Sequence, residues 1–454
     1  MSISMTRREM MCRGLLAASG PLWAGGSGFR ALAAEGVAAA RALPKPKGTA
    51  KSVIHIWPGG GPSHLDTFDP KPDAGPDCTG PLNEVIETNV PGIRINATLP
   101  LLANMADKYS IIRSFTHPEV GHEGDAVFAV TGRDTRIAFP SFLCVLSALR
   151  GYDAGYRGKV PPFVLLTENG GFRPAQLGFL DRKYGPFVTG GDPSKTPFVV
   201  EGIVTEGISD TRQKQRRDFL ATMDTLGQTM KGDPQWKPLE EARDEAYDMI
   251  LGEGRKIFDP ASEPDAVRDR YGRNKFGQCC LVARKLVQAG APVVHVNDSA
   301  RSATENWDTH CPIHFELMKT MLPVLDQGLS ALLQDLADHG LLDSTIVYWG
   351  AEMGRTPKVS KEFGGGLGRG HWSNCYSVVV AGGGFQGGRV VGESDAQGAF
   401  VKSRPVYPCD IIGSIYLLMG ISLDTLIPHP RLKYPVYPAP EEGVPCGGVL
   451  TEIM

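Results

Sequence analysis

Short apolar segments that alternate with helical segments constrain the fold of this chain most strongly. The apolar segments are bounded by glycine, proline or polar residues, which is the pattern of buried strands. The expected strands are 52–57, 110–113, 162–166, 291–296, 344–349 and 376–380. The expected helices include 276–288, 312–339 and 408–420. Strands separated by helices predict an α/β fold with a mostly parallel sheet and helices on both of its faces.

The remaining segments define the expected domain organisation. We predict a signal peptide over 1–33, a linker over 34–50, a single domain over 51–440 and a C-terminal tail over 441–454. Residues from about 210 to 271 are charged and helical, and we interpret them as a helical insertion. The region 170–210 is rich in glycine and proline and is expected to form long loops over the sheet edge.

The N-terminal residues resemble an export signal. Arg7 and Arg8 form a twin-arginine pair, a weakly apolar run follows, and Ala31-Leu32-Ala33 offers a cleavage site. The alternative is a basic leader without structure. We expect export by the twin-arginine route to the periplasm or the cell exterior, which allows a metal to be loaded before export.

Charge and composition exclude some classes of function. The formal net charge of −3 provides no general basic surface, so nothing here favours nucleic-acid binding. After the N-terminus, no apolar run approaches the roughly 20 residues that a transmembrane helix needs. The nine cysteines contain no C-x-x-C pair, which argues against a zinc ribbon. An oxidising compartment allows disulfide bonds to form, but the sequence does not show which cysteines would pair.

Acidic and imidazole residues follow the expected strands. In such sheets ligands bind beyond the carboxyl ends of the strands, so these residues are expected to converge. They are Asp66 after the first strand, Asp308 and His310 after 291–296, Glu352 after 344–349, and His371 in a glycine-rich loop. Oxygen and nitrogen donors of this kind suit one or two divalent cations such as Zn, Ca, Mg or Mn.

Each predicted ligand has a structural alternative. Asp308 would cap the following helix, Glu352 would pair with Arg355, and His371 would pack in its loop. If Asp66 is not the ligand, Asp69 and Ser63 are the substitutes. Expected core positions are His55, His295 and His314, which lie inside strands or a helix.

Further side chains are candidates for contact with the reacting group. His122 follows the second strand and is expected to face the reacting centre, with His117 and Glu123 as competitors. Arginine binds sulfate and phosphate through bidentate hydrogen bonds, and the candidates are Arg113, Arg355 and Arg369. The glycines at 59–61 would let backbone N–H groups approach an anion.

Several of these segments together resemble a known family. They are 59–72, 122–124, 276–290, 307–310, 335–343, 352–357 and 370–372. In this order they resemble the bacterial family called domain of unknown function 1501, over about residues 50–430. That family is grouped with sulfatases and alkaline phosphatases, so the resemblance implies a three-layer α/β/α sandwich with divalent metals at the strand ends. It also implies metal-dependent hydrolysis of a sulfate or phosphate ester.

The chain departs from the sulfatase pattern at two positions. Thr131-Gly132-Arg133 matches the end of the sulfatase motif, and His122 then falls where the nucleophilic cysteine would be. Met353 stands where related enzymes carry an imidazole. Three options stay open: attack by metal-bound water with His122 as base or ligand, a hydroxyl nucleophile (Ser63, Thr67 or Thr116), or no catalysis.

The sequence therefore predicts an exported metal-dependent hydrolase of sulfate or phosphate esters. Its catalytic candidates are His122, Ser63 and Arg355, and its substrate would be an anionic small molecule or a polysaccharide. The alternatives are a non-catalytic exported protein that binds glycans or anions, and a subunit of an exported assembly.

Overall fold

In the computed structural model, the described residues are 43–118, 121–133, 137–167, 175–203, 207–299, 306–310, 312–360, 367–439 and 442–454. The predicted signal peptide and most of the predicted linker lie outside these residues. Residues 45–454 form one compact unit. Among the described residues, no helix is long and apolar enough to cross a membrane.

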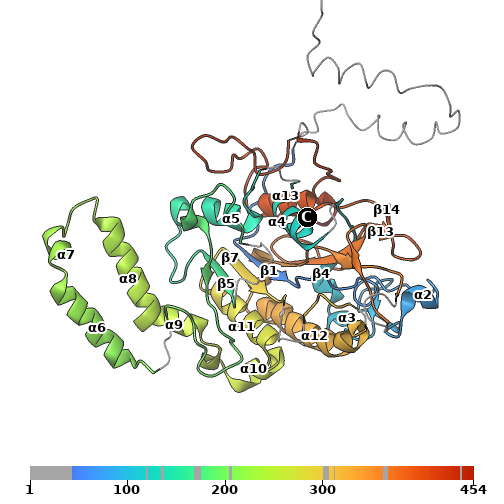
Figure 1. The fold of residues 1–454 in the computed structure, drawn as a ribbon, viewed down its shortest axis with the longest axis horizontal. Helices are drawn as coiled ribbons and strands as arrows, with labels where there is room; N and C mark the ends of the chain where they lie inside the picture. Colours follow the sequence, from blue (N-terminus) through green and yellow to red (C-terminus); the bar gives the residue numbers. More distant parts are fainter. Residues whose placement is uncertain are drawn as a thin grey trace, which may run out of the picture. The chain divides into compact units, whose positions relative to one another are not determined.

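A central eight-stranded sheet organises this unit (Figure 1). Its strands are β1 (Ser52–Trp57), β4 (Tyr109–Phe115), β5 (Phe163–Leu166), β6 (Phe187–Val188), β7 (Val293–Asn297), β8 (Thr345–Trp349), β11 (Tyr376–Ala381) and β12 (Arg389–Val391). They are ordered β12-β4-β11-β8-β1-β7-β5-β6. Only β11 runs antiparallel to its neighbours in this sheet, and the other pairs are parallel. The predicted, mostly parallel sheet is confirmed.

Helices cover both faces of the sheet. One face packs against α3 (Pro100–Ala103), α11 (Lys275–Gln288) and α12 (His314–Asp338). The other carries α4 (His122–Thr131), α5 (Phe142–Arg150) and α13 (Pro408–Leu418). Strand residues alternate between the two cores: Ile54 and Ile56 belong to the first, and Val53 belongs to the second. The α/β/α sandwich is therefore confirmed.

Local sequence signals place the two longest sheet-covering helices close to their predicted positions. The Asn274 side chain caps α11 by accepting the Gly277 N–H at 2.9 Å. The helix α12 follows an apolar stripe that runs from Met318 to Leu336, all of it facing the core. Pro323 lies inside α12 and does not end it.

The charged region from about 210 to 271 consists mainly of helices. It contains α6 (Asp210–Met223), α7 (Thr225–Thr229), α8 (Lys237–Leu251), α9 (Glu253–Phe258) and α10 (Asp265–Tyr271). In the C-terminal segment, Leu450 and Ile453 are buried in the core that contains α13.

Two histidines lie side by side in the centre of the sheet. His55 on β1 is in register with His295 on β7, and their Nδ1 atoms are 3.2 Å apart. The His55 ring stacks on Tyr348 at a centroid distance of 4.9 Å. Burial lowers the pKa of His295 to about 3 and holds the pKa of His55 well below its usual value. Both rings are therefore neutral parts of the core, as the sequence predicts.

We expect these histidines to make the fold sensitive to acid. A base whose pKa is lowered by folding contributes stability that is complete above its unfolded pKa of about 6.5 and is lost as the pH falls toward the folded pKa. For His295 alone, the free energy of unfolding should fall by about 2 kcal/mol between pH 7.5 and pH 5. Urea unfolding at the two pH values measures this difference.

The variant His295→Gln should lose this part of the pH dependence, whatever its stability at pH 7.5. The exposed His339→Gln is the matched control and should keep the wild-type difference. An unchanged pH dependence in His295→Gln would show that the acid sensitivity comes from elsewhere.

Candidate metal centre

The loops at the carboxyl ends of β1, β4, β7 and β8 bring the predicted donors together. Asp308 and His310 follow β7, Glu352 follows β8, and His122 is the first residue of α4. His371 opens β10 (His371–Trp372), which pairs antiparallel with β9 (Gly354–Arg355), so that His371 lies opposite Arg355. These positions follow from the parallel strands, which direct their following loops to one edge.

Asp308 is the centre of this group. Its Oδ1 lies 3.0 Å from His310 Nε2 and 3.1 Å from His371 Nε2, and its Oδ2 lies 3.2 Å from His122 Nε2. The Nε2 atoms of His310 and His371 are 3.1 Å apart. His122 Nδ1 lies 3.1 Å from Glu352 Oε1. We call these five residues (His122, Asp308, His310, Glu352 and His371) the Asp308 group.

The two carboxylates of the group determine its charge. Burial acts to raise the pKa of Asp308, but hydrogen bonds from His122, His371 and Arg355 hold it well below its usual value. Hydrogen bonds to Asp308 and Glu352 raise the pKa of His122 to about 9. Burial and the nearby Arg355 lower the pKa of His310. In this structure His122 is therefore protonated at neutral pH, and its ring lies between the side chains of Asp308 and Glu352.

Glu352 is held from several directions. Its Oε1 accepts the Gly60 N–H at 2.7 Å, and its carbonyl oxygen accepts a hydrogen bond from His117 Nε2 at 2.6 Å. Burial lowers the pKa of His117 to about 4, so this ring is a neutral donor. Glu352 is fully buried, and its Oε2 has no hydrogen-bond partner among the described residues.

The glycine segment after β1 brings backbone close to the Asp308 group. Gly60 has φ +110°, and a Cβ there would collide with the Asp308 backbone. Gly61 has φ +89°, and a Cβ there would lie 2.6 Å from the Met353 carbonyl oxygen. The anion that accepts the hydrogen bond from the Gly60 N–H is therefore the side chain of Glu352 in the same chain.

The donor set fits a divalent cation. Ligands at about 2.0–2.2 Å from a cation, separated by angles between 90° and the tetrahedral value, lie about 2.8–3.6 Å from one another. The spacings between Asp308, His310 and His371 are 3.0–3.1 Å. Donor atoms of His122, Asp308 and His371 all lie within 4.8 Å of one another. Hydrogen bonds alone give similar spacings, but they leave the buried Glu352 Oε2 without a partner.

Arg355 fixes the backbone around the Asp308 group through hydrogen bonds. Its side chain is fully buried, and it donates to the carbonyl oxygens of Gly61 at 2.9 Å, Trp307 at 3.1 Å and Thr309 at 3.3 Å, as well as to that of Gly60. Its Nη2 also donates to Asp308 Oδ1 at 2.7 Å. Arg355 was predicted to contact an anionic substrate, but these bonds make it a positioning residue instead.

Asp66 belongs to a separate buried ion pair. Arg369 donates to both of its carboxylate oxygens, at 2.8 and 3.1 Å, and His314 Nε2 lies 3.0 Å from Oδ2. Burial acts to raise the pKa of Asp66, but Arg369 and His314 hold it well below its usual value. The structure therefore places Asp66, which was predicted as a ligand, outside the Asp308 group. Arg369, predicted as an anion partner, is committed to Asp66.

Ser63 lies in the same turn as Asp66 and accepts the Asp66 N–H at 3.3 Å. Both its backbone and its side chain are buried, and its partners are residues of its own turn. This arrangement gives Ser63 a role in the turn and offers no contact with the Asp308 group.

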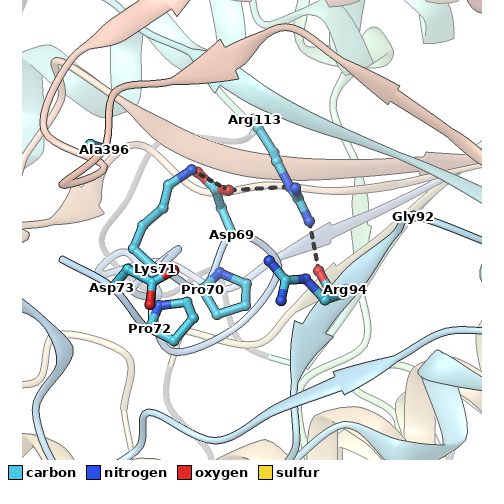
Figure 2. A pocket seen from close by; sticks show the side chains of 9 residues that line it. All are labelled: Asp69, Pro70, Lys71, Pro72, Asp73, Gly92, Arg94, Arg113 and Ala396. Carbon is cyan, nitrogen blue, oxygen red and sulfur yellow. Dashed lines mark hydrogen bonds and ion pairs between the residues drawn. The ribbon is translucent and has the colours of Figure 1, made fainter.

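Asp69 and Arg113 line a different pocket, of about 310 Å³ (Figure 2). Asp69 lies 3.0 Å from Lys71 Nζ and 3.3 Å from Arg113 Nε. Arg113 also donates to the Phe68 and Arg94 carbonyl oxygens, at 3.0 and 2.6 Å. Since Asp69 already neutralises these cations, this arrangement does not support the predicted role of Arg113 in anion binding.

Sequence patterns did not identify two histidines that matter here. His314 was expected in the core and is fully buried, yet it pairs with Asp66. His117 was a competitor of His122 and instead supports the Glu352 backbone. A buried histidine ring needs a hydrogen-bond partner, and this rule was the only signal in the sequence. The sequence does not show which residue that partner is.

The fold and the Asp308 group together define an α/β/α protein with a candidate divalent-metal centre at the carboxyl edge of its sheet. The family model described as "Protein of unknown function (DUF1501)" matches residues 50–432. The chain belongs to this family. No curated protein matches the sequence.

Similar solved structures include a sulfatase from Pseudoalteromonas sp., at 12% identity and a TM-score of 0.37, covering 83% of this chain and 68% of that chain. A phosphonate monoester hydrolase from Silicibacter pomeroyi has 10% identity and a TM-score of 0.35, with coverage of 85% and 78%. The lipoteichoic acid synthase LtaP from Listeria monocytogenes has 9% identity and a TM-score of 0.40, with coverage of 84% and 76%.

We expect the double variant Asp308→Ala/His310→Ala to lose bound metal. Both residues place donor atoms at the centre of the group, so the affinity for Zn²⁺ or Mn²⁺ should fall by at least about 10-fold. Metal content after loading and desalting, measured by elemental mass spectrometry, tests this. The exposed Asp73→Asn is the control, and equal metal content in the double variant would contradict the assigned ligands.

Asp66→Asn should instead reduce stability while metal content stays at the wild-type level. Removing the carboxylate charge leaves Arg369 buried without its counter-ion, which costs about 3–5 kcal/mol of unfolding free energy. Lys71→Ala, which breaks a partly exposed pair, should cost no more than about 1 kcal/mol. Urea unfolding gives both values. A folded Asp66→Asn protein without metal would restore Asp66 to the ligand set.

Proposed function

We propose that this chain is a metal-dependent hydrolase of sulfate or phosphate esters and that it is exported by the twin-arginine route. The observation that carries the proposal is the convergence of Asp308, His310 and His371 at one edge of the sheet, where His122 joins them to the buried Glu352. The proposed substrate is an anionic small molecule or a polysaccharide that carries such an ester.

These four residues would hold the cation. Their oxygen and nitrogen donors suit Zn²⁺ and Mn²⁺, and the carboxylates also suit Mg²⁺ and Ca²⁺. When bound, a divalent cation acts as a Lewis acid and neutralises charge on an anionic substrate oxygen. The Glu352 side chain is fully buried, and the hydrogen bond from the Gly60 N–H helps to fix its position.

His122 is the residue placed to move a proton. Its Nδ1 faces Glu352 Oε1, and this contact fixes the ring orientation, as the partner of a catalytic histidine does. Its Nε2 faces Asp308, so the ring lies between Asp308 and Glu352. The ring is partly exposed, with 24% of its side-chain surface accessible. Part of the ring is therefore open to solvent, while both of its nitrogens contact carboxylate oxygens.

The nucleophile that we propose is water. Among the described residues, the side chains bonded to those of Asp308, His371 and Glu352 are imidazole or guanidinium groups. None of these carries a hydroxyl or thiol. Thr309 is near in sequence, but its hydroxyl contacts His314 Nδ1 at 2.6 Å. His122 is protonated in this structure at neutral pH, so its proposed role is to give its proton to the leaving oxygen, and only its neutral form would accept a proton from the attacking water.

The same observation favours one competing function. Imidazole and guanidinium partners, found around the side chains of Asp308, His371 and Glu352 in the described part of the chain, also suit an exported protein that binds sulfated or phosphorylated glycans and does not hydrolyse them. The two functions share the cation and differ at His122, because binding requires no proton transfer.

Hydrolysis of chromogenic sulfate and phosphate esters by the metal-loaded protein tests the proposal. We expect turnover that falls by about 10²–10⁴-fold in His122→Ala, since general acid–base catalysis contributes that much. Metal content should be retained in that variant. Arg94→Ala, in the separate pocket of Figure 2, is the control and should retain turnover.

Three other outcomes would each change the conclusion. Bound metal without turnover, together with stabilisation by a sulfated glycan, would establish the binding protein. Loss of metal in His122→Ala would make His122 a ligand. Turnover that survives removal of the metal with a chelator would contradict the role of the cation.

A further inference from the structure

Two cysteines far apart in the sequence meet at the start of α13. Cys409 is the second residue of this helix and is buried, whereas Cys446 lies in the C-terminal segment and is exposed. Their Sγ atoms are 2.8 Å apart although the residues are 37 positions apart. A disulfide bond is about 2.05 Å long, so a small side-chain movement is enough to join them.

The backbone on both sides of the pair is fixed by one carboxylate. Asp410 follows Cys409, and it accepts the N–H groups of Gly447 at 2.8 Å and Gly448 at 2.9 Å, which follow Cys446. It also accepts the Tyr407 N–H at 2.9 Å. The two sulfurs are therefore held together by their neighbours, and their approach does not depend on the flexible ends of two side chains.

A metal site at the same place is not supported. The atoms of Cys409, Cys446 and Asp410 lie close enough to hold an ion, but structural zinc requires four ligands. The Asp410 oxygens are already occupied by three backbone N–H groups and by the Tyr437 hydroxyl at 3.2 Å. Two sulfurs alone suit a covalent bond better than a cation.

We propose that Cys409 and Cys446 form a disulfide that fastens the C-terminal segment to α13. The bond forms by exchange with a disulfide-containing oxidant. The Cys446 thiolate attacks one oxidant sulfur and releases one thiol. Cys409 then loses its proton and attacks the Cys446 sulfur, which releases the second thiol. Two protein thiols and one oxidant disulfide thus give one protein disulfide and two oxidant thiols.

The environments of the two thiols suit this order of attack. A hydrogen bond from Cys409 lowers the pKa of Cys446, and Cys446 is the exposed partner that an oxidant can reach. Burial raises the pKa of Cys409, which makes it the poorer first nucleophile. Cys409 would react second, within the mixed disulfide.

The cross-link would strengthen the helix layer that carries the candidate metal centre. Gly132, at the end of α4, approaches Cys409 so closely that a Cβ on it would lie 2.9 Å from the Cys409 Cα. The first residue of α4 is His122. Leu450 of the C-terminal segment also donates its N–H to the Ser414 side chain on α13 at 2.8 Å. The inference itself is independent of the proposed hydrolysis.

Mass mapping of the full-length protein tests the pair. The reduced protein is treated with oxidised glutathione, denatured, alkylated and digested. We expect a cross-linked peptide that contains Cys409 and Cys446 and a thermal midpoint that rises by about 4 °C relative to the reduced protein. Cys446→Ser should show neither change. Cys78→Ser is the matched control and should respond as the wild type does.

Other results would overturn the inference. They are alkylation of both cysteines after oxidation, glutathione retained on Cys446, or a thermal shift of the same size in Cys446→Ser. Stoichiometric zinc that is lost in Cys446→Ser would replace the disulfide with a metal site. Because Cys446 is exposed, its substitution is not expected to prevent folding.

Discussion

The buried guanidinium of Arg355 is the interaction on which the rest of the candidate site depends. It joins the loop after β1, through the carbonyl oxygens of Gly60 and Gly61, to the loop after β7, through Trp307 and Thr309. Loops that leave parallel strands are not fixed by the hydrogen bonds between strands. A fully buried guanidinium group, in turn, requires hydrogen-bond acceptors on every side. Arg355 and these carbonyl groups therefore determine one another's positions, and Asp308 is held at the same point.

A second buried arginine extends the same principle to the β9–β10 ribbon. Arg369 precedes His371 and binds Asp66, the Thr356 carbonyl oxygen at 3.1 Å and the Cys78 carbonyl oxygen at 2.8 Å. Asp66 thereby connects the β1 loop to this ribbon and to His314 on α12. The two arginines position Asp308 and His371, the donors that a cation would need, and neither is available to bind substrate.

The sequence predicted the layers and the approach of most of the proposed donors to one another, because both follow from local rules. Apolar periodicity indicated the strands and helices, and the strand ends indicated where Asp308, His310, Glu352 and His371 would meet. It did not predict that Asp66 pairs with Arg369, which is 303 positions away. In the sequence, a carboxylate that follows a strand has the same pattern whether its partner is a metal ion or an arginine. Only the tertiary structure distinguishes the two cases.

The same limit explains the glycines after β1 and the change at Met353. The glycine pattern correctly indicated a close backbone approach to an anion, but that anion is Glu352 of the chain itself. Met353 is fully buried and lies close to Gly61, so this side chain contributes packing. The imidazoles of His310 and His371 lie at 3.0 and 3.1 Å from Asp308 Oδ1. Arg355 and Arg369 hold the loops that carry His310 and His371. We therefore expect cation binding at this edge to depend on how rigidly these two arginines hold the loops.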